Sequence, residues 1–318
     1  MARWTGFLLL ALPAFCEPTA IEEALKKARV PDKPVAILVI GSDALAAALE
    51  KSLGDDAVKK ELGSFLVVKA AESDASVAAW AGGGTGIVVL SSFGREFLRW
   101  AASDMGDGNA ARVAELLAMA RGRYDKARKE VAVACAGFEA SLGGQDKEAM
   151  LDLAKKVTAL KDPRALQALA RGMDGKSLKV REHIIQEAHG IDEKLGQEML
   201  AGWLKRNPQA PLAPYAWKFV AAKADASLIP LLKDGIETCA PEYRIPALGR
   251  IRERSNIPYL IELLGRNSAS SGADSKEKEK IRDECNFALK ALTGQANEGA
   301  AAWKAWWKGN EKSFKFAE

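Results

Sequence analysis

The chain has 318 residues, of which 48% are hydrophobic and 28% charged, so it has enough apolar side chains to form ordinary globular cores. At this length, two domains are the usual expectation. The net charge of +4 is too small to indicate a nucleic-acid partner, and after the first residues no segment is apolar for long enough to cross a membrane, so neither feature is expected.

The first residues have the pattern of an export signal. Arg3 precedes a short apolar run over residues 7–14, and small residues and the polar Glu17 follow. This pattern predicts a signal peptide over residues 1–16, removed after Cys16, and an exported chain that is periplasmic or extracellular. The alternatives are a buried first helix and a lipoprotein anchored through Cys16, although bacterial lipoprotein signals favour a small residue where Phe15 stands.

Residues 20–124 alternate between strand and helix patterns. Short apolar runs rich in branched residues predict strands at residues 36–40, 65–68 and 87–90. Two helices are predicted from apolar side chains at helical spacing: Leu45, Ala48, Leu49 and Leu53 in the first, and Val113, Leu116, Leu117 and Ala120 in the second. Asn109 or Asp107 is expected to cap the second helix. The pattern indicates an α/β fold in which helices pack on a small sheet.

After a linking helix or loop at residues 125–146, the pattern of residues 147–318 is helical throughout. Three segments resemble one another, Ala165–Leu169, Leu228–Leu232 and Tyr259–Leu263, and their starts are 63 and then 31 residues apart. A missing copy falls at residues 195–200, within a helical window. The sequence therefore predicts a two-helix repeat of about 31 residues, whose copies must stack to bury their apolar faces.

The helical part resembles HEAT repeats in several motifs. Asp162–Leu169 and Ser255–Leu264 look like first helices, in which an Asp or Asn precedes an apolar helix. The pairs Ala247-Leu248 and Ala288-Leu289 look like those of second helices, and the ending with Trp303, Trp306 and Trp307 is similar to the close of many bacterial HEAT-repeat proteins. The resemblance covers roughly half the chain and implies an α-solenoid that serves as a protein-binding scaffold.

Residues 20–124 resemble the thioredoxin fold in element order. A helix from Ile21 leads through Lys33-Pro34 into the first strand, and Gly84–Gly86 precedes a later one. The two active cysteines of that family would fall at residues 42–45, and its cis-proline near Gly86, but neither is present. The resemblance implies a thioredoxin-like domain without its redox motif.

Thiol exchange needs an attacking thiolate, and Ser42 cannot replace one at neutral pH without an activating base. The first domain is therefore expected to act as a structural or binding module. Cys135 and Cys285 lie among apolar residues and look like core residues. Cys239 precedes a helix whose dipole favours a thiolate, but a packing role between repeats is expected for it, because free cysteine is usually buried. The only histidines, His183 and His189, have no close partner that completes a metal set, so no metal and no cofactor is expected.

Arginines recur near the second helices of the repeats: Arg181, Arg244, Arg250, Arg252, Arg254 and Arg282. If they share the inner curve of the array, they form a basic groove for an acidic protein, peptide or glycan. The alternative is a set of solvated helix faces and turn caps. The tryptophans Trp303, Trp306 and Trp307 are expected to shield the final repeat, with a partner site as the alternative.

These features predict an exported, non-enzymatic scaffold that binds a protein or another macromolecule through its repeats. One alternative is a thiol-dependent enzyme or redox protein that uses Cys239. The other is a structural component of a cell-envelope assembly.

Overall fold

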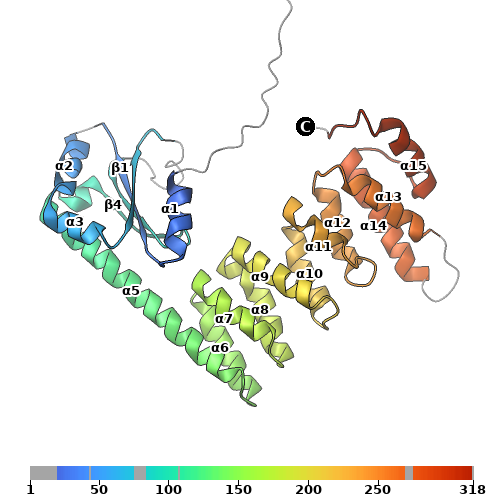
Figure 1. Ribbon diagram of the computed structural model, residues 1–318, viewed down its shortest axis with the longest axis horizontal. Helices are drawn as coiled ribbons and strands as arrows, with labels where there is room; N and C mark the ends of the chain where they lie inside the picture. Colours follow the sequence, from blue (N-terminus) through green and yellow to red (C-terminus); the bar gives the residue numbers. More distant parts are fainter. Residues whose placement is uncertain (1–19, 43, 75–83, 107, 269–274, 317–318) are drawn as a thin grey trace, which may run out of the picture. The chain divides into compact units, whose positions relative to one another are not determined.

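The computed structural model describes residues 20–42, 44–74, 84–106, 108–268 and 275–316, so the expected signal peptide and Cys16 lie outside the described residues. The chain divides into two compact units, residues 1–129 and 130–318. The first contains a small mixed sheet with helices, and the second contains helices only in its described residues (Figure 1). The expectation of an α/β domain followed by an all-α region is confirmed at this level.

The sheet of the first unit has four strands in the order β2-β1-β3-β4. Its strands are β1 (Val35–Ile40), β2 (Leu66–Ala71), β3 (Gly86–Leu90) and β4 (Glu96–Ala101). β1 runs parallel to β2 and antiparallel to β3, and β4 runs antiparallel to β3. Three of these strands were predicted, whereas the edge strand β4 was not.

Helices cover both faces of this sheet (Figure 1). They are α1 (Ala20–Arg29), α2 (Ala44–Leu53), α3 (Asp56–Leu62) and the first part of α5 (Ala110–Ser141), with a short 3-10 turn at Ala102–Met105. Alternate residues of β1 point to opposite faces: Ala36 and Leu38 pack with α2, α3 and α5, while Ile37 and Val39 pack with α1. A strand buried on both faces reads as a continuous apolar run, which is why β1 is visible in the sequence.

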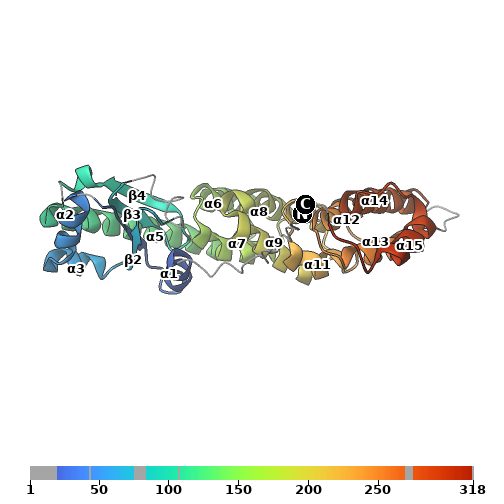
Figure 2. The same ribbon diagram turned by 90° about the horizontal axis from the view of Figure 1, so that it is seen from above.

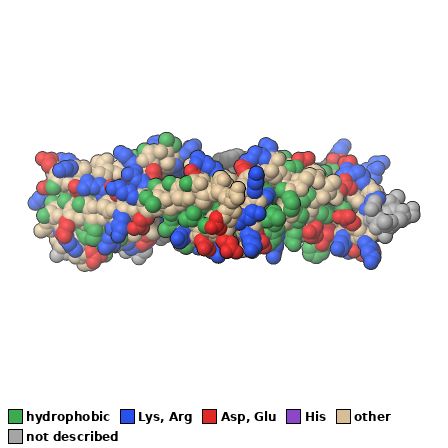
Figure 3. Space-filling model, turned by 90° about the horizontal axis from the view of Figure 1, so that it is seen from below, with side chains coloured by type: hydrophobic (Ala, Val, Ile, Leu, Met, Phe, Trp, Pro, Cys, Tyr) green, Lys and Arg blue, Asp and Glu red, His purple; other side chains and the backbone are tan. Residues whose placement is uncertain are grey.

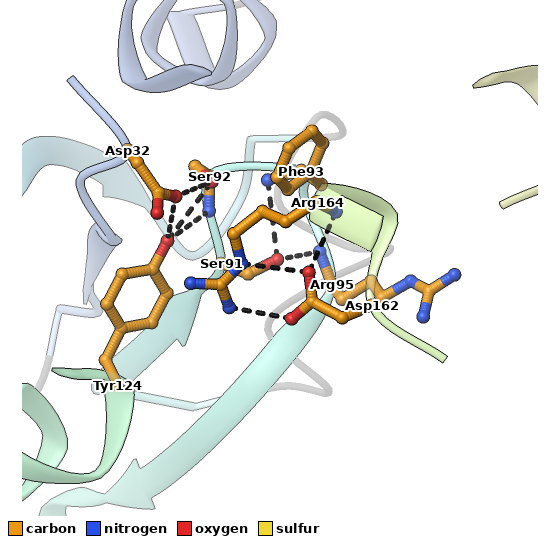
Figure 4. Close-up of polar contacts among 8 residues, drawn as sticks. All are labelled: Asp32, Ser91, Ser92, Phe93, Arg95, Tyr124, Asp162 and Arg164. Carbon is orange, nitrogen blue, oxygen red and sulfur yellow. Dashed lines mark hydrogen bonds and ion pairs between the residues drawn. The ribbon is translucent and has the colours of Figure 1, made fainter. Parts of the chain in front are cut away.

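A polar network ties the loop before β1, the turn after β3 and helix α5 together (Figure 4). The Tyr124 hydroxyl donates to Asp32 Oδ1 at 2.8 Å, and the Ser92 hydroxyl donates to the same oxygen at 2.7 Å. Asp32 has a φ of +46°, and the two hydroxyl bonds hold it in this left-handed conformation. Burial raises the pKa of Tyr124, so its hydroxyl keeps its proton and its role as a donor.

Helix α5 begins in the first unit and continues into the second. The boundary between the two units falls within it, between Lys129 and Glu130. Its predicted face, Val113, Leu116, Leu117 and Ala120, is buried. Asn109 is one of its two predicted caps and accepts a hydrogen bond from the Arg112 N–H at 3.3 Å, while the other, Asp107, lies outside the described residues. The interval 125–146, expected as a linking helix or loop, is mainly this helix.

The helices of the second unit alternate between two rows (Figure 2). One row has α6 (Lys147–Ala159), α8 (Leu178–Ile191), α10 (Ala213–Ala222), α12 (Pro241–Arg250) and α14 (Ser275–Thr293). The other has α7 (Leu166–Met173), α9 (Glu193–Arg206), α11 (Ile229–Lys233), α13 (Asn256–Arg266) and α15 (Gly299–Asn310), with 3-10 turns at Pro163–Ala165 and Ala226–Leu228. One apolar cluster runs from Phe138 to Trp307, so each helix packs on its neighbours in a continuous core.

Aspartates begin three successive segments of the second row. Asp162 accepts the N–H of Arg164 at 2.9 Å before α7, Asp192 accepts that of Leu195 at 2.9 Å in α9, and Asp225 accepts that of Ser227 at 2.9 Å before α11. Each carboxylate satisfies a backbone donor that the helix cannot use itself. The predicted missing copy at residues 195–200 lies in α9, which has the same cap as its neighbours.

Gly249 of α12 packs directly against Ala288 of α14. A Cβ atom at this position would lie 2.8 Å from Ala288 Cα, which is closer than such atoms normally come. Any larger residue must therefore push the two helices apart.

The described helices do not include one that is both long and apolar enough to span a membrane.

Candidate functional site

The turn after β1 is the place where the two active cysteines of the thioredoxin family would fall. Gly41 and Ser42 line a small depression of about 400 Å³ with Glu72, at the carboxyl ends of β1 and β2. Ser42 is exposed, and the Gly41 N–H donates to Thr85 Oγ1 at 3.0 Å. The described lining of this depression contains no thiol, so it holds no group for disulfide exchange.

The three cysteines of the described chain all have free thiols in apolar surroundings. Cys135 and Cys239 are half-buried and Cys285 is fully buried. Burial raises the pKa of each thiol above its usual range. At Cys239, burial outweighs the opposite effect of the Arg244 guanidinium, so a thiolate is disfavoured where the sequence allowed one.

We expect iodoacetamide at pH 7 to alkylate Cys239 several-fold more slowly in the folded chain than in the chain unfolded in urea, because both its burial and its raised pKa lower the reactive thiolate fraction. Peptide mapping by mass spectrometry measures the rate at each cysteine. Cys285 is the internal control and should react more slowly still, since its side chain is fully inaccessible. Faster alkylation of Cys239 in the folded chain would instead favour the thiol-dependent enzyme.

Both histidines are partly buried on α8. His183 Nε2 lies 2.9 Å from Thr158 Oγ1, and the ring of His189 stacks on that of Phe219. Desolvation lowers the pKa of both imidazoles, so both are neutral at pH 7. Within the described ranges, no group of three or more His, Cys, Asp or Glu side chains is placed to hold a metal ion.

Arg244, expected on a binding surface, is instead buried to 1% exposure inside the turn between α11 and α12. Its guanidinium donates to five backbone carbonyls, those of Leu231, Leu232, Asp234, Gly235 and Cys239. The Arg244 guanidinium also lies 4.4 Å from the centroid of the Trp217 ring. Desolvation lowers the pKa of Arg244 to about 10, which leaves it charged at neutral pH. Arg244 is therefore a structural residue and does not belong to a partner surface.

The other predicted arginines differ in their accessibility. Arg250 is exposed and donates to the Ala221 carbonyl at 2.7 Å, and Arg252 is exposed as well. Arg181 and Arg282 are half-buried on α8 and α14. Arg254 is exposed and lies 5.6 Å from the centroid of the Trp307 ring, so it is the one arginine that the structure joins to a predicted tryptophan.

The three predicted tryptophans form one aromatic cluster with Phe314 and Phe316. Trp303 is fully buried, and its indole N–H donates to Asn286 Oδ1 at 3.0 Å. Trp306 is half-buried, while Trp307 is 8% exposed. The cluster covers the end of the apolar core, as expected of a cap, but one side of Trp307 also borders a cleft.

This cleft lies between α13 and α15 and has a volume of about 640 Å³. Pro258, Ile261 and Gly265 of α13 form one wall, and Ala300, Ala301 and Trp307 of α15 form the other. Its walls are mainly apolar, and the cleft stays open because the small residues Gly265, Ala300 and Ala301 leave room that larger side chains would fill. We call this space the α13–α15 cleft.

Charged side chains border the α13–α15 cleft. Arg266 forms ion pairs with Glu237 at 3.3 Å and Glu262 at 2.8 Å, so one cation is shared by two carboxylates and one negative charge is left over. Lys304 also lines the cleft but has no carboxylate within ion-pair distance in the described chain. Figure 3 shows one face of the molecule, on which basic and acidic side chains alternate and apolar side chains reach the surface between them.

Comparison with known proteins found no match: no family model, no curated protein and no solved structure is similar to this chain at a significant level. The candidate site therefore rests on its own geometry. The sequence singled out Trp307 and Arg254 but missed the cleft beside them. The signal that indicates it is the run of small residues from Gly299 to Ala302 directly before the tryptophans.

Proposed function

We propose that this protein is an exported, non-catalytic scaffold that binds a partner protein through its helical unit. In this proposal the helical unit is a HEAT-like α-solenoid, and the first unit is a thioredoxin-like domain that has lost its redox chemistry. The observation that carries the proposal is the α13–α15 cleft, an open apolar surface beside the continuous apolar core of this unit.

The two-row arrangement supports the solenoid reading. The helices alternate between the rows, and the caps Asp162, Asp192 and Asp225 recur at the starts of successive second-row segments. In a solenoid each repeat needs its neighbours to bury its apolar face, which agrees with the single continuous core. Stacked repeats present extended surfaces and typically bind other macromolecules.

The sheet order supports the thioredoxin-like reading. The order β2-β1-β3-β4, with only β3 antiparallel to β1, agrees with the element order from which the resemblance was drawn. The described part of the turn at Gly41-Ser42 carries no thiol. The raised pKa of Cys239 argues against the rival enzyme.

Affinity capture with the full chain tests the scaffold. The bait is wild-type protein, tagged after residue 318 through a flexible linker and incubated with cell-envelope extract. The test variant is R254E/K304E, which reverses two exposed charges beside Trp307. The control K147E/K179E makes the same change in charge at exposed residues of α6 and α8. Arg250 is left unchanged because its bond to Ala221 would also be lost.

We expect partners, identified by mass spectrometry, to bind wild type and K147E/K179E and to be at least about tenfold depleted on R254E/K304E, because reversed charges repel the partner. Partners that bind all three baits equally would contradict a site beside Trp307. Absence of any reproducible partner would contradict the scaffold. Recovery of one partner set in fixed stoichiometry that resists both variants would favour the envelope-assembly alternative.

A further inference from the structure

We infer that the α13–α15 cleft binds an amphipathic α-helix of the partner, with large apolar side chains on one face and Asp or Glu residues beside that face. This inference rests on the proposed scaffold function and names the chemistry of the segment that the scaffold recognises. Three properties of the cleft lead to it: its backbone, its walls and its charges.

The backbone around the cleft favours a helix over an extended peptide. Both walls are α-helices, so their N–H and C=O groups are already bonded within α13 and α15. An extended peptide in the cleft would find no sheet edge to pair with, and its own buried polar groups would be left without partners. A helical peptide satisfies its backbone internally and needs only side-chain contacts from the cleft.

The walls of the cleft suit large apolar side chains. Ile261 and Trp307 are largely buried and line the cleft with their apolar edges, while Gly265, Ala300 and Ala301 are small and leave the space open. A volume of about 640 Å³ lies within the range of roughly 300–1,000 Å³ that is usual for binding pockets, and it has room for several side chains of the size of Leu. Apolar residues at positions i, i+3 or i+4, and i+7 of a docked helix would enter it together.

The charges beside the cleft favour acidic flanks. Arg266 is shared between Glu262 and Glu237, which leaves one negative charge there, and the three cations Lys304, Arg254 and Lys308 outnumber it. Lys304 within the cleft and Arg254 beside Trp307 have no carboxylate at ion-pair distance in the described residues. Lys308 follows one turn after Lys304 and is exposed. An acidic helix would neutralise these cations, whereas a basic helix would add repulsion.

The probe is a phage-displayed library of helix-forming 16-residue peptides, randomised at all positions except helix-favouring Ala residues, selected on immobilised full-length protein. Enriched peptides are then synthesised with a fluorescent label and titrated by anisotropy at two salt concentrations. We expect enrichment of amphipathic sequences with Asp or Glu beside the apolar face, and an affinity that falls as salt rises.

Three variants locate the site. A301W fills the cleft, and its matched control A302W places the same side chain on the next exposed residue of α15, which does not line the cleft. K304E reverses the charge in the cleft. We expect A301W and K304E each to weaken peptide binding at least about tenfold, while A302W changes it less than about twofold.

Enriched peptides that are basic, or whose binding A301W and A302W affect equally, would overturn the inference, and so would a selection that enriches nothing above an empty surface. The scaffold is judged separately by capture from extract. If captured partners bind wild type and A301W equally, the result supports the scaffold function and contradicts helix binding in the α13–α15 cleft. If capture yields no partner, the proposed scaffold function is contradicted, whatever the result of the peptide selection.

Discussion

Replacing Arg244 with methionine is expected to destabilise the helical unit by about 3–5 kcal/mol, because this substitution leaves buried polar groups without a partner. Methionine fills a similar space but cannot donate a hydrogen bond. The five carbonyls that the guanidinium satisfies, between Leu231 and Cys239, would lose their donor in the turn between α11 and α12. The favourable contact with the Trp217 ring would be lost as well.

Urea unfolding followed by tryptophan fluorescence and far-ultraviolet circular dichroism measures this loss. R244K tests the geometry of the guanidinium, since one ammonium cannot reach five carbonyls, and should fall between wild type and R244M. R252M is the matched control on an exposed arginine and should change stability by less than about 0.5 kcal/mol. An R244M protein as stable as R252M would show that the carbonyls find other donors.

Replacing Trp303 with alanine is expected to cost about 3–5 kcal/mol, since it removes a large side chain from a fully buried position and leaves a cavity. Trp303 joins α15 to α14 through its bond to Asn286 and packs edge-on against Trp306. Its loss therefore loosens the helix that closes the apolar core.

The matched comparison is W306A on the same helix. Trp306 is only half-buried, so W306A should cost clearly less than W303A. W303F keeps much of the apolar contact and should lose about 1–2 kcal/mol, because Asn286 Oδ1 loses the indole donor and keeps only the weaker bond from the Gly299 N–H at 3.3 Å. Equal losses in W303A and W306A would mean that α15 does not depend on the buried ring. Both are measured in the same urea titration, with intact helix content checked beforehand by circular dichroism.

The sequence predicted those elements whose buried residues form a continuous apolar run or recur with a regular period. Strand β1 is apolar on both faces, and the predicted face of α5 is buried as a unit, so both are visible as patterns. Strand β4 was missed because it buries only Trp100, which leaves no alternation to detect, whereas β2 at the other edge alternates buried Val68 and Ala70 with exposed residues. Sequence patterns therefore predict helices and strands whose apolar faces are well buried, and they miss elements that are only partly buried.

The candidate site could be predicted only in part, because it depends on contacts between distant residues. The tryptophans were visible as a cluster at helical spacing, and Arg254 was one of several candidates. The cleft needs α13 and α15 to lie side by side, and nothing in either segment alone specifies this. Arg244 was predicted as a binding residue for the same reason. No local sequence pattern reveals that the carbonyls of a turn converge on its side chain and bury it.

The bonds of Arg244 also bear on how the helical unit responds to acid. Ion pairs such as Lys161–Glu187 weaken when the carboxylate takes up a proton, but all five acceptors of Arg244 are peptide carbonyls, which do not titrate. The pKa of Arg244 is about 10 when folded and higher when unfolded, so below pH 10 the group is protonated in both states. The contribution of Arg244 to the stability of the helical unit is therefore constant from neutral to acid pH. The turn between α11 and α12 stays stabilised at acid pH, whereas surface ion pairs weaken as their carboxylates take up protons.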